Sequence, residues 1–232
     1  MIGASLAADA RVAVYWAPEL DDPLHRDGSC WLGRDAEMGV SLPQPNVPGH
    51  DLHALTADPR GYGLHATLKA PFRLRVSWAE VRAAAASLAA RLRPFDLPPL
   101  AVRDLDGFLA LRETVPCPPL HALADACVAA LDACRAPPDE AELAKRRRAK
   151  LSPEQEANLV RWGYPHAFGA WRFHVTLTRR LKPAEKAAVL PAVEAHLRGA
   201  LRHRRRVSSF CLFTQAPPDA PFLIAERIPL GG

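Results

Sequence analysis

The stretches "GLHATLK" (63–69) and "FHVTLT" (173–178) share the pattern H-x-T-L, and their two histidines lie 109 positions apart. In a β-strand, residues i and i+2 point to the same face. His65 and Thr67 therefore project together, as do His174 and Thr176, while the residues that alternate with them point into apolar packing. Each stretch is expected to offer one imidazole and one hydroxyl group to a common surface.

The chain repeats one plan after each of these stretches. After the first, Ser77 and Glu80 form a capping box at the start of a predicted helix, and Asp106-Gly107 marks a hairpin between two β-like runs. After the second, a helix is expected from Pro183, again followed by two β-like runs. This internal similarity predicts an α+β fold of two duplicated lobes, each a small antiparallel sheet with flanking helices, around a central cleft.

The repeat also predicts how the chain is organised. We expect a single bilobal domain over residues 1–232, with a first H-x-T unit at about 63–113 and a second at about 171–230. Between them, a helical insertion is expected at about 136–165, as a lid or flank. A capping box that begins at Ser152 supports a helix within this insertion.

The composition is that of a globular protein with a basic surface. The 232 residues are 49% apolar and carry a formal charge of +5, which favours anionic partners. The first residues lack a basic segment ahead of an apolar run, so no signal peptide is expected, and charges interrupt every apolar run, which argues against a membrane span. The five cysteines include no C-x-x-C pair, so we expect reduced thiols in a cytoplasmic protein.

Two imidazoles and two hydroxyl groups in one cleft suit the cleavage of a phosphoester without a metal. A neutral imidazole can take a proton from water, and a protonated imidazole can give one to the departing alkoxide. The hydroxyl groups can donate hydrogen bonds to the phosphate oxygens as negative charge develops. His65 and His174 are therefore the candidate acid and base, in either order, with Thr67 and Thr176 as phosphate-binding residues.

Other kinds of site fit the sequence less well. No metal or other cofactor is expected, since neither motif contains Asp or Glu and no H-x-H or H-E-x-x-H pattern occurs. The G-x-S-x-G and G-x-x-x-x-G-K-[ST] patterns of hydrolases and nucleotide-binding proteins are also absent.

The paired motifs resemble those of the 2H phosphoesterase superfamily. The resemblance extends over nearly the whole chain and is closest to an uncharacterised branch associated with bacterial phosphonate-utilisation operons. It rests on "YWAP" (15–18), "WLG" (31–33), "GLHATLKAPFRL" (63–74), "GFLALR" (107–112), "ELAKRRRAKLSPEQEANLVRWGYP" (142–165) and "FHVTLT" (173–178). It implies that the two histidines are the acid–base pair and that the two motif threonines hold the phosphate.

The operon association implies a small phosphorylated sugar as substrate, such as 5-phosphoribosyl 1,2-cyclic phosphate. One alternative is an RNA 2′,3′-cyclic phosphodiesterase or another RNA end-processing enzyme, which would use the basic runs at 145–150 and 202–206. Another is a phosphate- or RNA-binding module without turnover. No membrane partner is expected.

Further residues are candidates for binding the substrate. Strand alternation continues the face of His65 to Lys69, and that of His174 to Thr178 and Arg172. The resemblance favours a cleft position for Tyr15, on the first predicted strand. Trp162 and Tyr164, just before the second motif, are expected either to wall the pocket or to pack in the core.

Overall fold

The computed structural model of the chain describes residues 10–217 and 219–231. Residues 1–9, part of the stretch in which no signal peptide is expected, lie outside the described residues. The helices are α1 (Pro23–Leu32), α2 (Leu52–Leu55), α3 (Ala57–Tyr62), α4 (Trp78–Ala89), α5 (Pro118–Ala130), α6 (Glu140–Arg147), α7 (Pro153–Trp162) and α8 (Pro183–Leu201), with 3-10 turns at Asp132–Cys134 and Phe168–Ala170. The strands are β1 (Arg11–Trp16), β2 (Arg34–Asp35), β3 (Val40–Ser41), β4 (Ala66–Arg73), β5 (Phe95–Leu97), β6 (Leu100–Leu105), β7 (Phe108–Glu113), β8 (Val175–Thr176), β9 (Arg205–Val207), β10 (Ser209–Gln215) and β11 (Leu223–Pro229).

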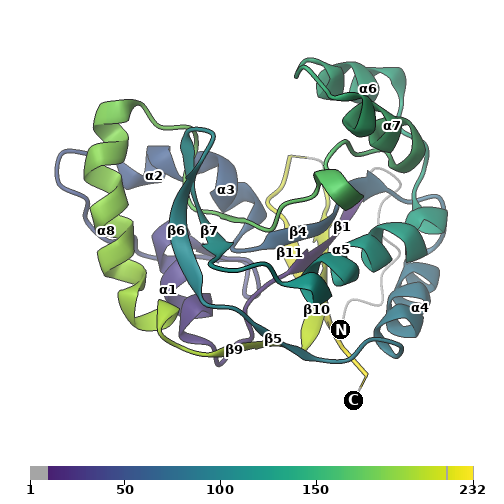
Figure 1. Cartoon of the computed structure of the whole chain (residues 1–232), viewed down its shortest axis with the longest axis horizontal. Helices are drawn as coiled ribbons and strands as arrows, with labels where there is room; N and C mark the ends of the chain where they lie inside the picture. The colour runs from purple at the N-terminus through teal and green to yellow at the C-terminus, as the bar shows by residue number, and fades with distance from the viewer. Residues whose placement is uncertain (1–9, 218, 232) are drawn as a thin grey trace.

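An antiparallel sheet of seven strands forms the centre of the molecule, in the order β11-β10-β1-β4-β8-β7-β6 (Figure 1). The two motif strands, β4 and β8, are neighbours in this sheet and are joined at the residue pair Ala66–Val175. The predicted α+β fold is confirmed. The two small sheets that we expected meet at this pair and form one continuous sheet.

Each motif strand lies beside strands from the other half of the sequence. β4, from the first repeat, is in the part of the sheet that contains the C-terminal strands β10 and β11, whereas β8, from the second repeat, pairs with β7 of the first hairpin. The helices are exchanged in the same way. The helix of the second repeat, α8, packs against β6 of the first, whereas α4 of the first repeat packs against β11 of the second. Both parts of the sheet are therefore built from both repeats.

The two faces of the sheet have different roles. Val12, Val14 and Trp16 of β1 belong to the main hydrophobic core, whereas Ala13 and Tyr15 belong to a second, smaller cluster on the opposite face. The main core also takes the alternating apolar residues of both motifs, which are Ala66, Leu68, Val175 and Leu177. The motif histidines and threonines consequently point to the face that is not filled by the main core.

The local signals in the sequence are confirmed in the structure. Both predicted capping boxes are present, at Ser77 before α4 and at Ser152 before α7. The hairpin between β6 and β7 turns at Asp106 and Gly107, which both have positive φ, as a type I′ turn requires. The segment 19–60, which is rich in Asp, Pro and Gly, includes the ten-residue helix α1. In the part of the chain that is described, no helix is both long and apolar enough to cross a membrane.

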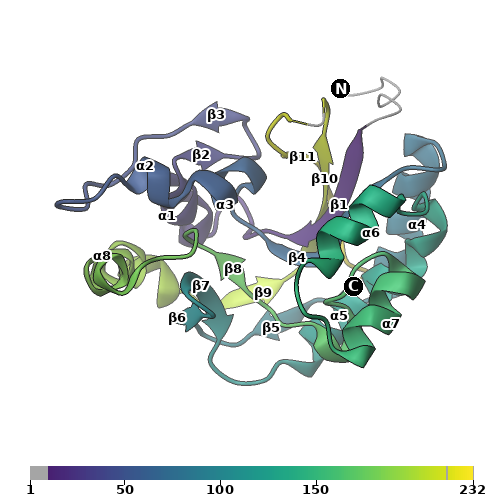
Figure 2. The ribbon, with the colours of Figure 1, turned by 90° about the horizontal axis from the view of Figure 1, so that it is seen from above.

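The insertion 136–165 forms α6 and α7, which stand together at one end of the molecule (Figures 1 and 2). Both helices begin with a capping box, at Asp139 and Ser152. None of the α6 residues is buried. Exposed ion pairs hold α6 instead, from Arg73 to Asp139 and Glu142, and from Arg147 to Glu156 of α7.

Gly63 sets the entry of the chain into the first motif. Its backbone lies at φ 79° and ψ 178°, a conformation that is essentially restricted to glycine. A Cβ atom at this position would lie 2.4 Å from the Cβ of Ala36, a buried residue. Glycine is therefore favoured at position 63 both by the backbone conformation and by the lack of space for a Cβ atom.

We expect Gly63→Ala to lower the free energy of unfolding by about 1–3 kcal/mol, because alanine is strained in this backbone conformation. The measurement is urea denaturation followed by circular dichroism. The matched control is Gly61→Ala in α3, where no atom lies within 4 Å of the new methyl group. It should be neutral or stabilising by up to about 1 kcal/mol, and equal destabilisation by both substitutions would contradict the prediction.

Candidate active site

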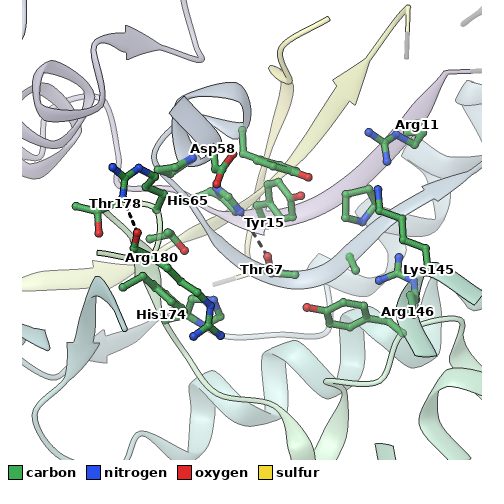
Figure 3. A pocket seen from close by; sticks show the side chains of 18 of the residues that line it. Arg11, Tyr15, Asp58, His65, Thr67, Lys145, Arg146, His174, Thr178 and Arg180 are labelled. Atoms are coloured by element: carbon green, nitrogen blue, oxygen red, sulfur yellow. Dashed lines mark hydrogen bonds between the residues drawn. The ribbon is translucent and has the colours of Figure 1, made fainter. Parts of the chain in front are cut away.

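The pairing of β4 with β8 brings the four motif side chains together. In the register of the Ala66–Val175 pair, His65 lies opposite Thr176, and Thr67 lies opposite His174. All four line one cavity of about 610 Å³ on the face of the sheet away from the main core. Figure 3 shows His65, Thr67 and His174 in this cavity. Each histidine thus has a hydroxyl group of the other motif as its cross-strand neighbour.

The two imidazoles are held in the same way. The Nδ1–H of His65 donates to the carbonyl oxygen of Gly63 at 2.9 Å, and that of His174 donates to the carbonyl oxygen of Arg172 at 2.9 Å. Because a carbonyl oxygen can only accept, the proton of each neutral ring is on Nδ1, and Nε2 keeps its lone pair. The Thr67 hydroxyl lies 3.4 Å from Nε2 of His65. Both rings therefore have Nε2 available for proton transfer.

Both histidines are neutral at physiological pH. Burial lowers the pKa of His65 to about 4, although its bond to Gly63 opposes this and the neighbouring His174 adds to it. Burial also lowers the pKa of His174, with a further contribution from Arg112 and Arg172. A bound anion would have the opposite effect and would favour the protonated form of the nearer ring.

All three tyrosines of the sequence, Tyr15, Tyr62 and Tyr164, line the same cavity. The Tyr15 ring stacks on the His65 imidazole, with 4.0 Å between the ring centroids. Burial raises the pKa of Tyr15 well above its usual value and also raises the pKa of Tyr164. The phenols of Tyr15 and Tyr164 remain protonated, so they offer hydroxyl donors to the cavity rather than negative charge.

Tryptophan indoles fix the backbone of each motif. Trp171 Nε1 donates to the carbonyl oxygen of Thr67 at 2.8 Å, and Trp31 Nε1 donates to that of Leu177 at 3.0 Å. The Thr178 hydroxyl accepts from the backbone N–H of Leu109 at 3.0 Å, which holds the end of the second motif against β7. The site is consequently positioned by bonds between segments far apart in the sequence.

Most of the predicted site residues meet in the cavity. Those that line it are Tyr15, His65, Thr67, Tyr164, His174, Thr176 and Thr178. Arg172 instead lines a smaller adjoining cavity of about 300 Å³, where one of its guanidinium nitrogens is 3.9 Å from the Asp106 carboxylate. Trp162 lines neither cavity and packs against Phe168, with 5.0 Å between the ring centroids.

Lys69 does not point into the cavity, which corrects the prediction from strand alternation. Between Tyr15–Thr67 and Val14–Lys69 the pairing of β1 with β4 advances by one residue in β1 and by two in β4. This bulge reverses the side-chain alternation. The Lys69 ammonium is buried on the other face, where it donates to the carbonyl oxygen of Val128 at 3.0 Å and lies 3.6 Å from Asp132.

Several cavity residues are missing from the sequence prediction. They are Tyr62 and the basic residues Arg11, Lys145, Arg146, Arg179 and Arg180. Arg11 shares the face of Tyr15 at an even spacing on β1, so strand alternation was a usable signal. Lys145 and Arg146 belong to the basic run of the insertion, and only the placement of α6 shows that these two members face the cavity. The described residues contain no group of three or more His, Cys, Asp or Glu side chains placed to hold one metal ion.

Comparison with protein families gives a match over much of this chain. The model of a family described as "Protein of unknown function (DUF1045)" matches residues 67–223. This agrees with the uncharacterised branch expected from the sequence. The cavity residues from Thr67 to Arg180 lie within the match, whereas His65 and β1 precede it.

Two curated proteins are similar over most of this chain. A "Ribose 1,5-bisphosphate phosphokinase PhnN" of Janthinobacterium sp. (strain Marseille) is 40% identical over 231 residues, which cover 96% of this chain and 51% of the relative. A protein of the same name from Laribacter hongkongensis (strain HLHK9) is 38% identical over 222 residues, covering 94% and 51%. The chain thus spans about half the length of these curated relatives.

Solved structures of LigT from E. coli are also similar. The apo form has a TM-score of 0.48 at 16% identity, with 97% of this chain and 100% of that chain covered. The complex with NADP+ has a TM-score of 0.46 at 16% identity and the same coverage.

We expect Lys69→Met to leave the affinity for inorganic phosphate unchanged, because the ammonium group does not reach the cavity. The substitution should lower the free energy of unfolding by about 1–3 kcal/mol, since the buried carbonyl oxygen of Val128 loses its donor. Titration calorimetry and urea denaturation measure the two effects. A loss of phosphate affinity in a fully folded variant would contradict this prediction and indicate that Lys69 contributes to phosphate binding.

The two histidines should also make stability depend on pH. Their folded-state pKa values are lowered from an unfolded value of about 6.5, so the unfolded chain binds more protons as the pH falls below 6.5. The free energy of unfolding is therefore not reduced by these histidines above about pH 6.5, and it decreases as the pH falls toward 4. The measurement is the free energy of unfolding from pH 7 to 4.5, for the wild type and for His65→Gln. The variant should show the weaker dependence, and equal slopes would contradict the prediction.

Proposed function

This chain belongs to the DUF1045 family, and we propose that it is a 2H-type hydrolase that opens a cyclic phosphodiester without a metal ion. The observation that carries the proposal is the pair of imidazoles that line one cavity and whose Nε2 atoms both carry a lone pair. A binding protein needs neither two proton-transfer groups nor matching tautomers. The paired arrangement therefore favours catalysis over a binding module without turnover.

The reaction needs two proton transfers on opposite sides of the phosphorus atom. One Nε2 takes a proton from water as its oxygen attacks phosphorus. The other imidazole, protonated, gives its proton to the ester oxygen as the P–O bond of the ring breaks. The products are a phosphomonoester and a free hydroxyl group on the same sugar. Each positioned acid or base contributes about 10²–10⁴ in rate.

Because the pKa values of both histidines are lowered, the histidine that acts as the acid would be protonated only when substrate is bound. Both rings are neutral in the free protein. An anionic phosphate raises the pKa of the adjacent histidine, so the acid acquires its proton with the substrate. The Thr67 and Thr176 hydroxyl groups and the exposed Arg180 line the same cavity and can donate to the phosphate oxygens.

The proposed substrate is 5-phosphoribosyl 1,2-cyclic phosphate. Cleavage of its bond between phosphorus and O2 yields ribose 1,5-bisphosphate, the compound that the names of both curated relatives give as their kinase substrate. This chain matches about half of each relative and lacks the G-x-x-x-x-G-K-[ST] pattern. We assign the kinase activity of those relatives to the other half, so that the two halves would catalyse consecutive steps. This agrees with the phosphonate pathway implied by the sequence resemblance.

The placement of the basic runs weighs against the RNA alternative. In the run 202–206, Arg205 is buried and paired with Asp22 at 2.8 Å, and no member lines either cavity. The runs 145–150 and 202–206 lie at α6 and at the far end of α8, on opposite sides of the molecule (Figure 1). They do not form one track that could follow an RNA backbone.

The proposal is tested by ³¹P NMR in EDTA with three substrates offered separately. These are 5-phosphoribosyl 1,2-cyclic phosphate, a 2′,3′-cyclic nucleotide and a short RNA with a 2′,3′-cyclic end. We expect selective opening of the ribose ester. His65→Ala and His174→Ala should each lower kcat by about 10²–10⁴-fold.

The matched control is His203→Ala, which removes an exposed histidine that lines neither cavity. It should keep full activity. Turnover of the RNA end alone would make the protein an RNA-processing enzyme. Full activity in either motif variant would overturn the two-histidine mechanism.

A further inference from the structure

The cavity has two chemically different ends. Figure 3 shows His65, His174 and Arg180 toward one end and Arg11, Lys145 and Arg146 toward the other, with Tyr15 and Thr67 between them. The first end holds the proton-transfer groups. The second holds cations and no imidazole. A ligand that fills the cavity therefore meets a second positive region away from the reacting centre.

The cations of the second end are not neutralised by any residue that the structure describes. Among the described residues, no carboxylate forms an ion pair with Arg11, Lys145 or Arg146, although the next residue, Arg147, pairs with Glu156. Two carboxylates do line the cavity. Glu142 is paired with Arg73, and Asp58 is exposed on α3. The charge that remains at the second end is positive.

The orientation of these cations is set by neighbouring side chains. The Arg146 guanidinium lies over the Tyr164 ring, 5.0 Å from its centroid. Arg11 donates through Nε to Gln215 at 2.7 Å, and its two terminal nitrogens form no hydrogen bond with any described residue. A guanidinium fixed by stacking or through Nε still presents its terminal N–H groups to a ligand, and this geometry suits phosphate oxygens.

We propose that Arg146 and Lys145, together with Arg11, bind a second phosphate group of the substrate, a monoester that does not react. The inference rests on the proposed function and extends it, because it assigns binding residues to the 5-phosphate of the proposed substrate. The motif residues would hold the cyclic phosphate, and these cations would hold a terminal phosphate on the same sugar. The site would then select phosphorylated sugars over unphosphorylated ones.

The weak attachment of α6 to the rest of the protein is consistent with a role in binding phosphate. The helix buries no residue and is held by exposed ion pairs and by the Arg146–Tyr164 contact. Exposed pairs contribute little stability each. A phosphate bound by Lys145 and Arg146 would add contacts between α6 and the rest of the cavity wall.

The first test uses binding and does not depend on turnover. Titration calorimetry compares ribose 5-phosphate with ribose for the 232-residue chain. The wild type should bind only the phosphate ester, and Arg146→Ala and Lys145→Ala should each weaken it by about tenfold or more, as expected for loss of a charged hydrogen bond. The control Arg148→Ala removes a cation of the same run that lines neither cavity, and it should bind like the wild type. Equal binding by all four proteins would overturn the proposal.

The second test separates this proposal from the proposed reaction. The kcat/KM values for ribosyl 1,2-cyclic phosphate with and without a 5-phosphate are compared in the wild type and in Arg146→Ala. The variant should lose activity only on the phosphorylated ester. If neither ester is opened but the binding pattern holds, the reaction is wrong and the phosphate site stands. If both are opened equally well and Arg146→Ala changes neither, the reaction stands and the phosphate site is wrong.

Discussion

The site depends on the single residue pair that joins β4 to β8. Ala66 and Val175 are both completely buried, and their pairing places each histidine beside the threonine of the other motif. A shift of either strand by one residue would turn the histidine and the threonine of that strand into the main core. The hydrophobic burial of the alternating residues therefore keeps the polar side chains on the cavity face, because a slip of one residue would expose apolar residues and bury an imidazole.

The exchange of strands between the repeats gives this pair its support. Because β4 lies beside β1 and β8 lies beside β7, each motif is braced by strands on its outer side, and the two motifs meet in the middle of the sheet. The indole bonds from Trp171 and Trp31 tie the motif carbonyl groups to distant segments. A rigid frame of this kind holds catalytic groups at a constant separation, which acid–base chemistry on a small substrate requires.

Symmetry of the motifs and asymmetry of their surroundings have separate consequences. The two imidazoles have equivalent backbone bonds, so each is suited to proton transfer. The insertion with α6 and α7 has no counterpart among the described residues of the second repeat, and it places Arg146 at one end of the cavity (Figure 3). The proposed acid–base pair is thus nearly symmetric, while the proposed phosphate site at one end would set the orientation of the substrate.

The sequence by itself determined the α+β repeat, the capping boxes at Ser77 and Ser152, the Asp106-Gly107 hairpin and the H-x-T pairs, because periodicity and turn chemistry are local. Only the tertiary structure decided which strands are neighbours, since pairing depends on contacts between distant segments. It also decided the position of Lys69, because a bulge in the pairing with β1 turns this side chain away from the site. Arg146 lines the cavity because of where α6 is placed. A bulge depends on both strands of a pair, and alternation within one strand cannot reveal it.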